Sequence, residues 1–310
     1  MKLKRIISVF ALIFILTSLF SIAASADTGP KPSVRITFEN LGDELCFATL
    51  LSSTSSTGPA SVWNGEDEYA MHNENPNGRY SYLSYGYDIW KAFVDYAEND
   101  GFYFLQELWQ INKTKELAWT YYPPSKFKIL LYFPESEKFM VSDVYERYAF
   151  DSYFTVDMSK SELSVDYNEE QSSDERINAY RSYNYAIEII SLVLRIIITI
   201  AIEIAIAFLF CFREKKQMLF LAGMNIATQI ILNLLLNIIN YSMGRGAFLL
   251  FYILFELIVV IIEAVLMLLF VNKLSAKPKR RLTMLVYVLI SNIASFGLGL
   301  LLAEWIPTLF

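Results

Sequence analysis

The stretch Ile187–Phe212, IEIISLVLRIIITIAIEIAIAFLFCF, decides the fold of this chain. It is long enough to cross a hydrocarbon core of about 30 Å at ~1.5 Å per residue. It nevertheless carries three charged side chains, Glu188, Arg195 and Glu203. Because charged side chains inside a bilayer are rare and generally face protein or water, the stretch predicts a membrane-spanning helix with one face against other helices.

Three more apolar segments follow the first one, which predicts a four-helix transmembrane bundle over residues 186–304. The predicted spans cover residues 186–212, 217–240, 247–271 and 283–304. Basic residues are concentrated in loops 213–217 and 272–282, and the positive-inside rule places these loops in the cytoplasm. Residues 27–185 and the C-terminus then lie outside, which predicts a multi-pass protein of a plasma membrane.

Residues 1–26 have the pattern of a secretory signal peptide. Basic side chains within the first five positions precede the apolar stretch Ile6–Ile22, and Ala24-Ser25-Ala26 forms a small-x-small cleavage site. The apolar stretch is long for a signal peptide, so an uncleaved anchor is the alternative interpretation.

Residues 27–165 predict a mainly β extracytoplasmic domain. Apolar and polar residues alternate over Val34–Phe38 and again over Phe127–Phe133, which is the period of a half-buried strand. Apolar residues within Asp88–Asn99 recur at helical spacing instead. About seven short strands with one inserted helix favour a sandwich-like domain, with an α+β arrangement as the alternative.

Residues 166–185 are polar and acidic, and they predict a linker that becomes a juxtamembrane helix. Tyr180, Tyr183 and Tyr185 lie where an interfacial aromatic belt belongs. The predicted fold class is therefore a membrane protein of α+β type, with a signal peptide, a sandwich-like outer domain and a four-helix bundle.

Charge and cysteine content exclude several classes of function. The chain has a net charge of −6, but residues 27–182 hold 26 acidic and 13 basic side chains, a net charge of −13. So acidic an outer part argues against nucleic acid or an anionic lipid surface as its partner. Cys46 and Cys211 fall in different parts of the chain, so neither a disulfide nor a cysteine-based metal site is expected.

The sequence lacks the common catalytic and cofactor motifs. It has no His-Glu-x-x-His, no phosphate-binding glycine loop and no Gly-x-Ser-x-Gly. His72 is the only histidine, and it lies in a loop of the outer domain. We therefore expect a non-enzymatic protein without a cofactor, and an intramembrane enzyme is the remote alternative.

Polar side chains of the four spans form a predicted intramembrane cluster. Measured along their spans, Arg195 and Glu256 lie at one depth, and Glu203 and Glu263 lie at another. The second and fourth spans add amide side chains at helical spacing. The predicted cluster comprises Arg195, Glu203, Glu256, Glu263, Asn225, Gln229 and Asn292.

This cluster has two interpretations. In the first it holds the helices together: Arg195 pairs with Glu256, and amides bond across helices at only ~0.6 kcal/mol each. In the second, Glu203 and Glu263 bind or transfer an ion. A charge at the bilayer centre costs ~2.5–3.5 kcal/mol, and neutral amide side chains would be enough to hold the helices together. Two carboxyl groups at one depth cannot both ionise cheaply, so they would share a proton or cation or meet a partner's basic residue.

Trp63 is the candidate ligand contact on the surface of the outer domain. It lies in the long polar loop 52–77, whereas core packing accounts for most other tryptophans of this domain. An exposed tryptophan could stack on a sugar or a wall polymer.

Two segments of the outer domain carry a resemblance to known proteins. They are Thr28-Gly29-Pro30-Lys31-Pro32-Ser33, which leads into the first predicted strand, and Thr57–Gly65, TGPASVWNG, in the long loop. Together with the four spans, they resemble an uncharacterised group of membrane proteins from Gram-positive bacteria of the Firmicutes. The resemblance implies a bacterial plasma-membrane location and no particular activity or site.

Two functions fit these patterns. In the first, the outer domain binds a ligand or a protein partner, and the bundle is an anchor, a complex subunit or the transmitting part of a sensor. In the second, the chain is a small proton- or cation-coupled transporter that uses the intramembrane Glu and Arg side chains and assembles as a homo-oligomer. Both predict the lipid bilayer and another protein chain as partners.

Overall fold

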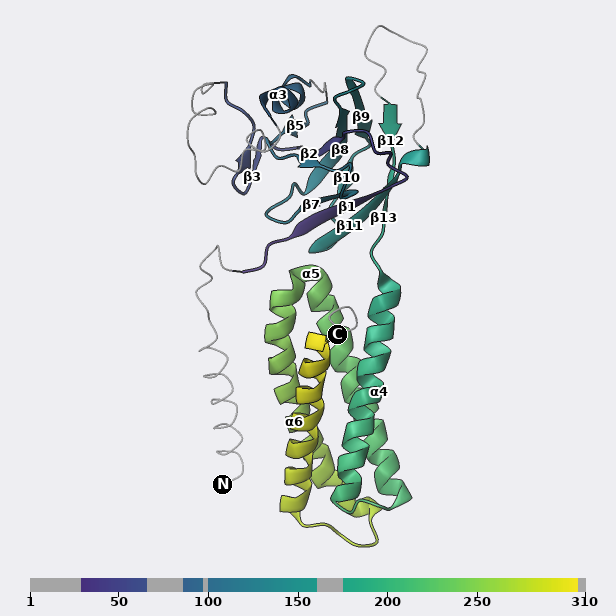
Figure 1. The fold of residues 1–310 in the computed structure, drawn as a ribbon. Coiled ribbons are helices and arrows are strands. Elements are labelled where there is room, and N and C mark those ends of the chain that lie inside the picture. The colour runs from purple at the N-terminus through teal and green to yellow at the C-terminus, as the bar shows by residue number, and fades with distance from the viewer. Residues whose placement is uncertain (1–28, 66–85, 97–99, 161–174, 306–310) are drawn as a thin grey trace. The chain divides into compact units, whose positions relative to one another are not determined.

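The computed structural model describes residues 29–65, 86–96, 100–160 and 175–305. The predicted signal peptide, much of the loop 52–77 and residues 166–174 of the predicted linker lie outside these ranges. The described chain has a β-rich part followed by long apolar helices (Figure 1). The prediction of a mixed α+β chain with membrane-spanning helices is confirmed at this level.

The first sheet has four strands in the order β13-β11-β1-β7. Its strands are β1 (Ser33–Glu39), β7 (Glu116–Trp119), β11 (Asp151–Asp157) and β13 (Ala179–Arg181). β1 pairs in parallel with β11 and antiparallel with β7, so that Ile36 lies opposite both Phe154 and Leu117. The predicted alternation of β1 is confirmed, because its apolar side chains are buried and the polar ones between them are exposed.

The second sheet has seven strands, with β12-β9-β8-β2-β5 as its main order. β10 pairs with β8, and β6 pairs with β2. The strands are β2 (Phe47–Ser52), β5 (Tyr103–Phe104), β6 (Trp109–Gln110), β8 (Lys126–Phe133), β9 (Lys138–Ser142), β10 (Tyr145–Glu146) and β12 (Glu175–Ile177). A separate hairpin, β3 (Ser56–Thr57) with β4 (Ala60–Ser61), stands where the sequence predicted only loop.

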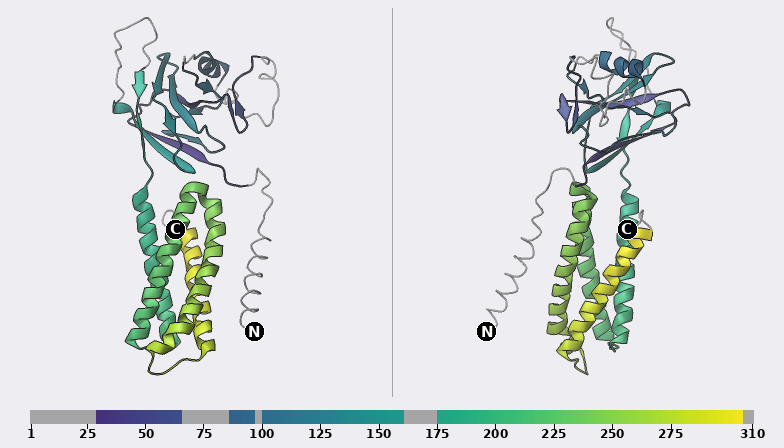
Figure 2. Two further views of the ribbon diagram at one scale, coloured as in Figure 1. Left: turned by 180° about the vertical axis from the view of Figure 1, so that it is seen from behind. Right: turned by 60° about the vertical axis from the view of Figure 1, so that its left-hand side comes forward.

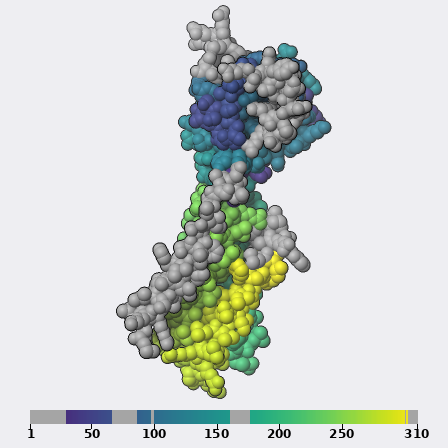
Figure 3. Space-filling view, turned by 90° about the vertical axis from the view of Figure 1, so that its left-hand side faces the viewer, coloured from purple at the N-terminus to yellow at the C-terminus, as the bar shows by residue number. Residues whose placement is uncertain are grey.

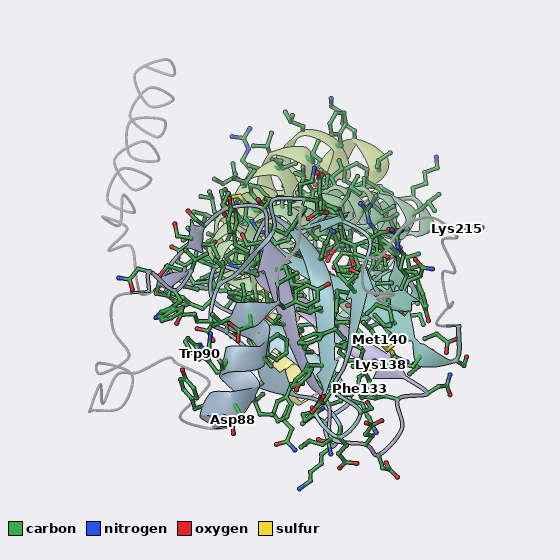
Figure 4. All side chains as sticks on the ribbon, turned by 90° about the horizontal axis from the view of Figure 1, so that it is seen from above. Asp88, Trp90, Phe133, Lys138, Met140 and Lys215 are labelled. Atoms are coloured by element: carbon green, nitrogen blue, oxygen red, sulfur yellow. The ribbon has the colours of Figure 1, made fainter. Side chains whose placement is uncertain are left out.

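The two sheets enclose one apolar core, and a helix covers the outer face of the second sheet. Side chains of β1, β7 and β11 meet those of β2, β8 and β9 in this core. On the other face of β8, Leu130 packs with Trp90 and Phe93 of α3 (Tyr87–Asp95), the helix that carries Asp88 and Trp90 in Figure 4. β8 is thus buried on both faces, so the half-buried strand predicted over Phe127–Phe133 is wrong, because α3 covers its second face. The inserted helix is where the sequence predicted it.

The predicted juxtamembrane helix within residues 166–185 is wrong for the described residues 175–181. β12 pairs in parallel with β9, and β13 pairs antiparallel with β11, so this short segment joins both sheets. Ile177 is buried in the shared core. Strand pairing with distant residues, which local composition does not reveal, fixes this segment. α4 (Tyr185–Leu209) begins only after it, where the Asn184 side chain accepts a hydrogen bond from the Ile187 amide at 3.2 Å.

In the part of the chain that the structure describes, three helices are long and apolar enough to cross a membrane, not the four that were predicted. They are α4, α5 (Lys215–Phe270) and α6 (Arg281–Trp305). The difference arises because the predicted spans 217–240 and 247–271 are joined in α5. Exposed apolar side chains line these helices; α6, which is yellow in Figure 3, presents Leu289 and Ile293 at 51% and 62% exposure.

α5 reverses direction at Gly244, where the backbone is not helical (φ 80°, ψ 177°). A straight helix would separate Phe220 from Phe270 by about 75 Å at ~1.5 Å per residue, yet their ring centroids are 6.0 Å apart. The two halves therefore lie side by side, as Figure 1 and Figure 2 show. We call residues 215–243 the first leg of α5 and residues 245–270 the second leg.

Candidate functional site

The surfaces where the helices pack together bury polar side chains beside apolar ones. Each of α4, both legs of α5 and α6 contributes buried polar side chains. These are Ser191, Glu203, Gln217, Asn225, Thr228, Gln229, Asn233, Glu263, Ser291, Asn292 and Ser295. Apolar residues face outward because the lipid chains solvate them, so the helices bury what a bilayer cannot hydrogen-bond.

Glu263, on the second leg of α5, is held by side chains from two other segments. The Thr228 hydroxyl of the first leg donates to Oε1 at 2.9 Å. The Asn292 amide of α6 donates to Oε2 at 2.7 Å. Glu263 is 1% exposed, and both of its hydrogen-bond donors are neutral. Its carboxyl group thus ties three helical segments together without a cationic partner among the described residues.

Glu203 of α4 lies against the same face of α6. The Ser295 hydroxyl donates to Glu203 Oε1 at 3.4 Å, and the Tyr287 hydroxyl donates to the Glu203 carbonyl oxygen at 3.3 Å. Glu203 is also 1% exposed, and its Oε2 has no hydrogen-bond partner among the described residues. Asn292 and Ser295 are three residues apart on α6, so one helix face contacts both carboxyl groups.

The first leg of α5 adds a row of amide side chains. Asn225 is fully buried, and neither its Nδ2 nor its Oδ1 has a partner among the described residues. Asn233 donates to the Gln229 carbonyl oxygen at 2.8 Å and to its side-chain Oε1 at 3.2 Å. Asn292 Oδ1 is likewise buried without a partner. Buried polar atoms without a hydrogen-bond partner are uncommon in proteins, and a proton, a water molecule or an ion can satisfy them.

The predicted ion pair between Arg195 and Glu256 is wrong. The Arg195 guanidinium donates instead to Asn237 Oδ1 of the first leg at 3.5 Å, and its Nε is buried without a partner. Glu256 Oε2 also has no partner in the described part of the chain. Equal depth did not produce a contact, because a long arginine side chain can reach several neighbours and here it reaches another helix face.

Trp63 is not the free surface contact that the sequence suggested. Its ring packs edge-on against Trp90 of α3, with centroids 5.5 Å apart, and Lys91 Nζ lies 5.6 Å from the Trp63 centroid. The residue is half-buried beside the α3 core. Part of a polar loop is thus drawn into the packing between α3 and the second sheet.

Two members of the site were missed from the sequence, namely Thr228 and Tyr287. Thr228 could have been found, because it is three residues from Asn225 and so lies on the same helix face. Tyr287 carries no such signal, since it is surrounded in sequence by apolar residues of α6. The predicted members Glu203, Glu263 and Asn292 are brought together, whereas Arg195 and Glu256 stay apart.

The chemistry of this site follows from its own groups. No protein-family model, curated protein or solved structure matches this chain. Among the described residues, no three His, Cys, Asp or Glu side chains come together as a metal site would require. Two buried carboxyl groups with hydroxyl and amide neighbours can hold a proton, or a monovalent cation that prefers oxygen ligands.

Proposed function

We propose that this chain is a multi-pass membrane protein whose helices take up a proton or a monovalent cation at Glu203 and Glu263. One observation carries the proposal: both carboxyl groups are 1% exposed, and their described hydrogen-bond donors are neutral. A carboxylate in such surroundings is costly unless a proton or a cation neutralises it.

Energetics favour ion chemistry over a purely structural role. A charged residue at the bilayer centre costs ~2.5–3.5 kcal/mol on insertion scales. A hydrogen bond between membrane helices returns only ~0.6 kcal/mol on average. Neutral side chains can provide such bonds, as the Tyr287 hydroxyl of α6 does to the Glu203 carbonyl oxygen of α4. The presence of two carboxyl side chains at these positions is therefore not explained by helix association, whereas a reversible change of protonation or cation occupancy explains it.

The proposed membrane arrangement has four crossings. At ~1.5 Å per residue, each leg of α5 exceeds the about 30 Å of a hydrocarbon core. The basic loops 213–217 and 272–282 would be cytoplasmic, and residues 27–185 would lie outside, in the plasma membrane of a Gram-positive bacterium. Four crossings are few for a transporter, so transport would require a second copy or another subunit beside α4 and α6.

The test is ion flux in proteoliposomes that contain the full chain. Glu203→Gln, Glu263→Gln and the double variant keep the shape of each side chain but cannot release a proton. Glu214→Gln is the control, because the Glu214 carboxyl group lies outside the buried pair and accepts hydrogen bonds from the Ser275 hydroxyl and the Ala276 amide. We expect normal membrane abundance with lost proton, Na⁺ or K⁺ flux for the first three variants and unchanged flux for the control. Lost abundance together with no flux in the unmodified protein would instead indicate a structural role.

A second candidate function is transmission of a binding event from the β-rich part to the helices. Its support is a direct contact: the Phe150 amide donates to the Tyr241 carbonyl oxygen at 2.8 Å, and the Phe150 ring lies against Gly244 at the reversal of α5. A ligand or protein partner that moves the 149–151 segment would therefore act on α5. Phe150→Ala tests this idea, because unchanged flux and unchanged protease sensitivity of the α5 turn would contradict it.

A further inference from the structure

A second polar region lies outside the carboxyl site, at the start of α4 and the reversal of α5. A cavity of about 490 Å³ opens there. Its lining includes two guanidinium groups, two carboxylates and tyrosine rings, contributed by Arg195, Arg245, Asp151, Glu188, Tyr183 and Tyr241. This volume is within the range of small-molecule sites, which run from about 300 to 1,000 Å³.

Within the described residues, neither arginine of this cavity forms an ion pair with a carboxylate. Arg195 forms one hydrogen bond, to Asn237 at 3.5 Å, and its Nε is buried without a hydrogen-bond partner there. Arg245 is exposed, and no ion pair or hydrogen bond joins it to another described residue. Guanidinium groups bind carboxylate and phosphate oxygens through paired N–H donors. Two free guanidinium groups facing one cavity therefore point to an anionic group as their missing partner.

The two acids of the cavity indicate that this ligand also carries a positive charge. Asp151 accepts a hydrogen bond from the Ser33 hydroxyl at 2.5 Å, and Glu188 accepts one from the Tyr183 hydroxyl. These donors are neutral hydroxyl groups, so neither carboxyl group has a cationic side chain as its hydrogen-bond partner among the described residues. A simple anion would leave the acids unmatched, whereas an ammonium group could approach Glu188 and the tyrosine rings through ionic and cation–π attraction.

We propose that this cavity binds a zwitterion, with its phosphate or carboxylate group on Arg195 and Arg245 and its ammonium group beside Glu188. Ile187 and Phe248 add apolar surface to the lining, which suits a ligand with an apolar portion. The same chemistry occurs in a phosphatidylethanolamine headgroup and in a free amino acid. The cavity is separate from the carboxyl site, since Arg195 and Glu203 are eight residues, or about 12 Å of helix, apart.

Binding to the full chain in nanodiscs distinguishes these sources. Native mass spectrometry would compare retention of phosphatidylethanolamine, phosphatidylcholine and phosphatidylglycerol, and thermal unfolding would be followed with a mixture of the twenty amino acids. Preferential retention of phosphatidylethanolamine assigns the lipid, and stabilisation by the amino-acid mixture assigns a soluble zwitterion. Equal retention of all three lipids, with no effect of amino acids, overturns the proposal.

Substitutions locate the binding. Arg245→Gln should weaken binding by ~10-fold to ~100-fold, the value of one charge-assisted contact, and Arg195→Lys should weaken it through loss of the paired donors. Glu188→Gln should reduce the preference for phosphatidylethanolamine over phosphatidylglycerol. Arg281→Gln, at the start of α6 and outside the cavity lining, is the control and should change nothing. An equal loss of binding in Arg281→Gln, or normal binding in Arg245→Gln, contradicts the proposed site. Glu203→Gln should bind the ligand normally, whether or not Glu203 and Glu263 take up a proton or a cation.

Discussion

The β-rich part and the helices differ in the acidic side chains that they bury. Between the sheets, the core is made of residues such as Ile36, Ile129 and Phe154, each at most 1% exposed. Within the helices, Glu203 and Glu263 are buried to the same extent, while Leu209 is 80% exposed. The difference teaches that water surrounds the first part and lipid the second, and that the helices keep acids inside for a reason other than burying apolar surface.

The largest expected effect is the difference in stability between a truncation in the core of the β-rich part and one on the exposed face of a helix. Phe154→Ala removes a ring from the core between the sheets and should destabilise the β-rich part by about 3–5 kcal/mol. Leu209→Ala removes an apolar group that is 80% exposed, and it should change stability by less than about 0.5 kcal/mol. Thermal unfolding of the purified full chain, followed separately by tryptophan fluorescence and by helical circular dichroism, measures both. Similar losses for the two variants would contradict the contrast.

A second prediction concerns the reversal of α5. Gly244 has φ 80°, and a Cβ added there would lie 2.4 Å from the Phe150 ring. Gly244→Ala should therefore lower the stability of the protein by about 1–3 kcal/mol through backbone strain alone. Adding Phe150→Ala to this variant should recover only the stability lost through the clash with the Phe150 ring. Gly223→Ala is the matched control, because a Cβ at this helical glycine meets no atom within 4 Å. It should be neutral or stabilise the helix by up to about 1 kcal/mol in the same unfolding measurement.

A smaller effect is expected for the polar contacts of α6. Asn292→Ala removes the donor to Glu263, and at the values typical of membrane helices it should cost about 0.6–1.7 kcal/mol. Ion flux should fall by more than this modest loss of stability implies, because Asn292 positions the Glu263 carboxyl group. Ser291→Ala, one residue away on α6, is the comparison variant. Equal flux in the two variants would show that the Asn292 contact has no functional role.

The last prediction concerns the rates at which a thiol reagent labels the two cysteines, which perturbs the protein least. Burial, reinforced by the negative charge of Glu44, raises the pKa of the Cys46 thiol to about 12. At pH 8 only about 1 in 10,000 Cys46 thiols would then be ionised. Maleimide should label the exposed Cys211 and leave Cys46 unmodified until the β-rich part unfolds. Rapid labelling of Cys46 in the folded protein would show that this core is open to water.

Local patterns predicted much of the fold because they report burial residue by residue. The alternation of β1, the helical spacing of α3 and the apolar segments of α4 and α6 all follow from the nearest neighbours in sequence. The non-helical residue Gly244, where α5 reverses, falls within the predicted gap 241–246.

Local patterns could not predict which residues distant in sequence pair or pack with one another. β12 and β13 lie in a polar, acidic stretch and become strands only because β9 and β11 offer free edges. Trp63 is covered because α3 packs against the second sheet beside it. For the candidate site, helix faces predicted Glu203, Glu263 and Asn292, but the reach of the Arg195 side chain depended on its rotamer. Depth along a helix is readable from sequence, whereas the direction of a long side chain is not.

The central claim is that Glu203 and Glu263 are neutralised by a proton or a cation and not by a basic residue. Infrared spectroscopy of the full chain in membranes at neutral pH tests it most directly, with Glu188→Gln as the reference. We expect a band of protonated buried carboxyl groups that disappears in the Glu203→Gln, Glu263→Gln double variant, or a carboxylate band of the same two residues that depends on added Na⁺ or K⁺. Fully ionised carboxylates that respond to neither cation would contradict the account.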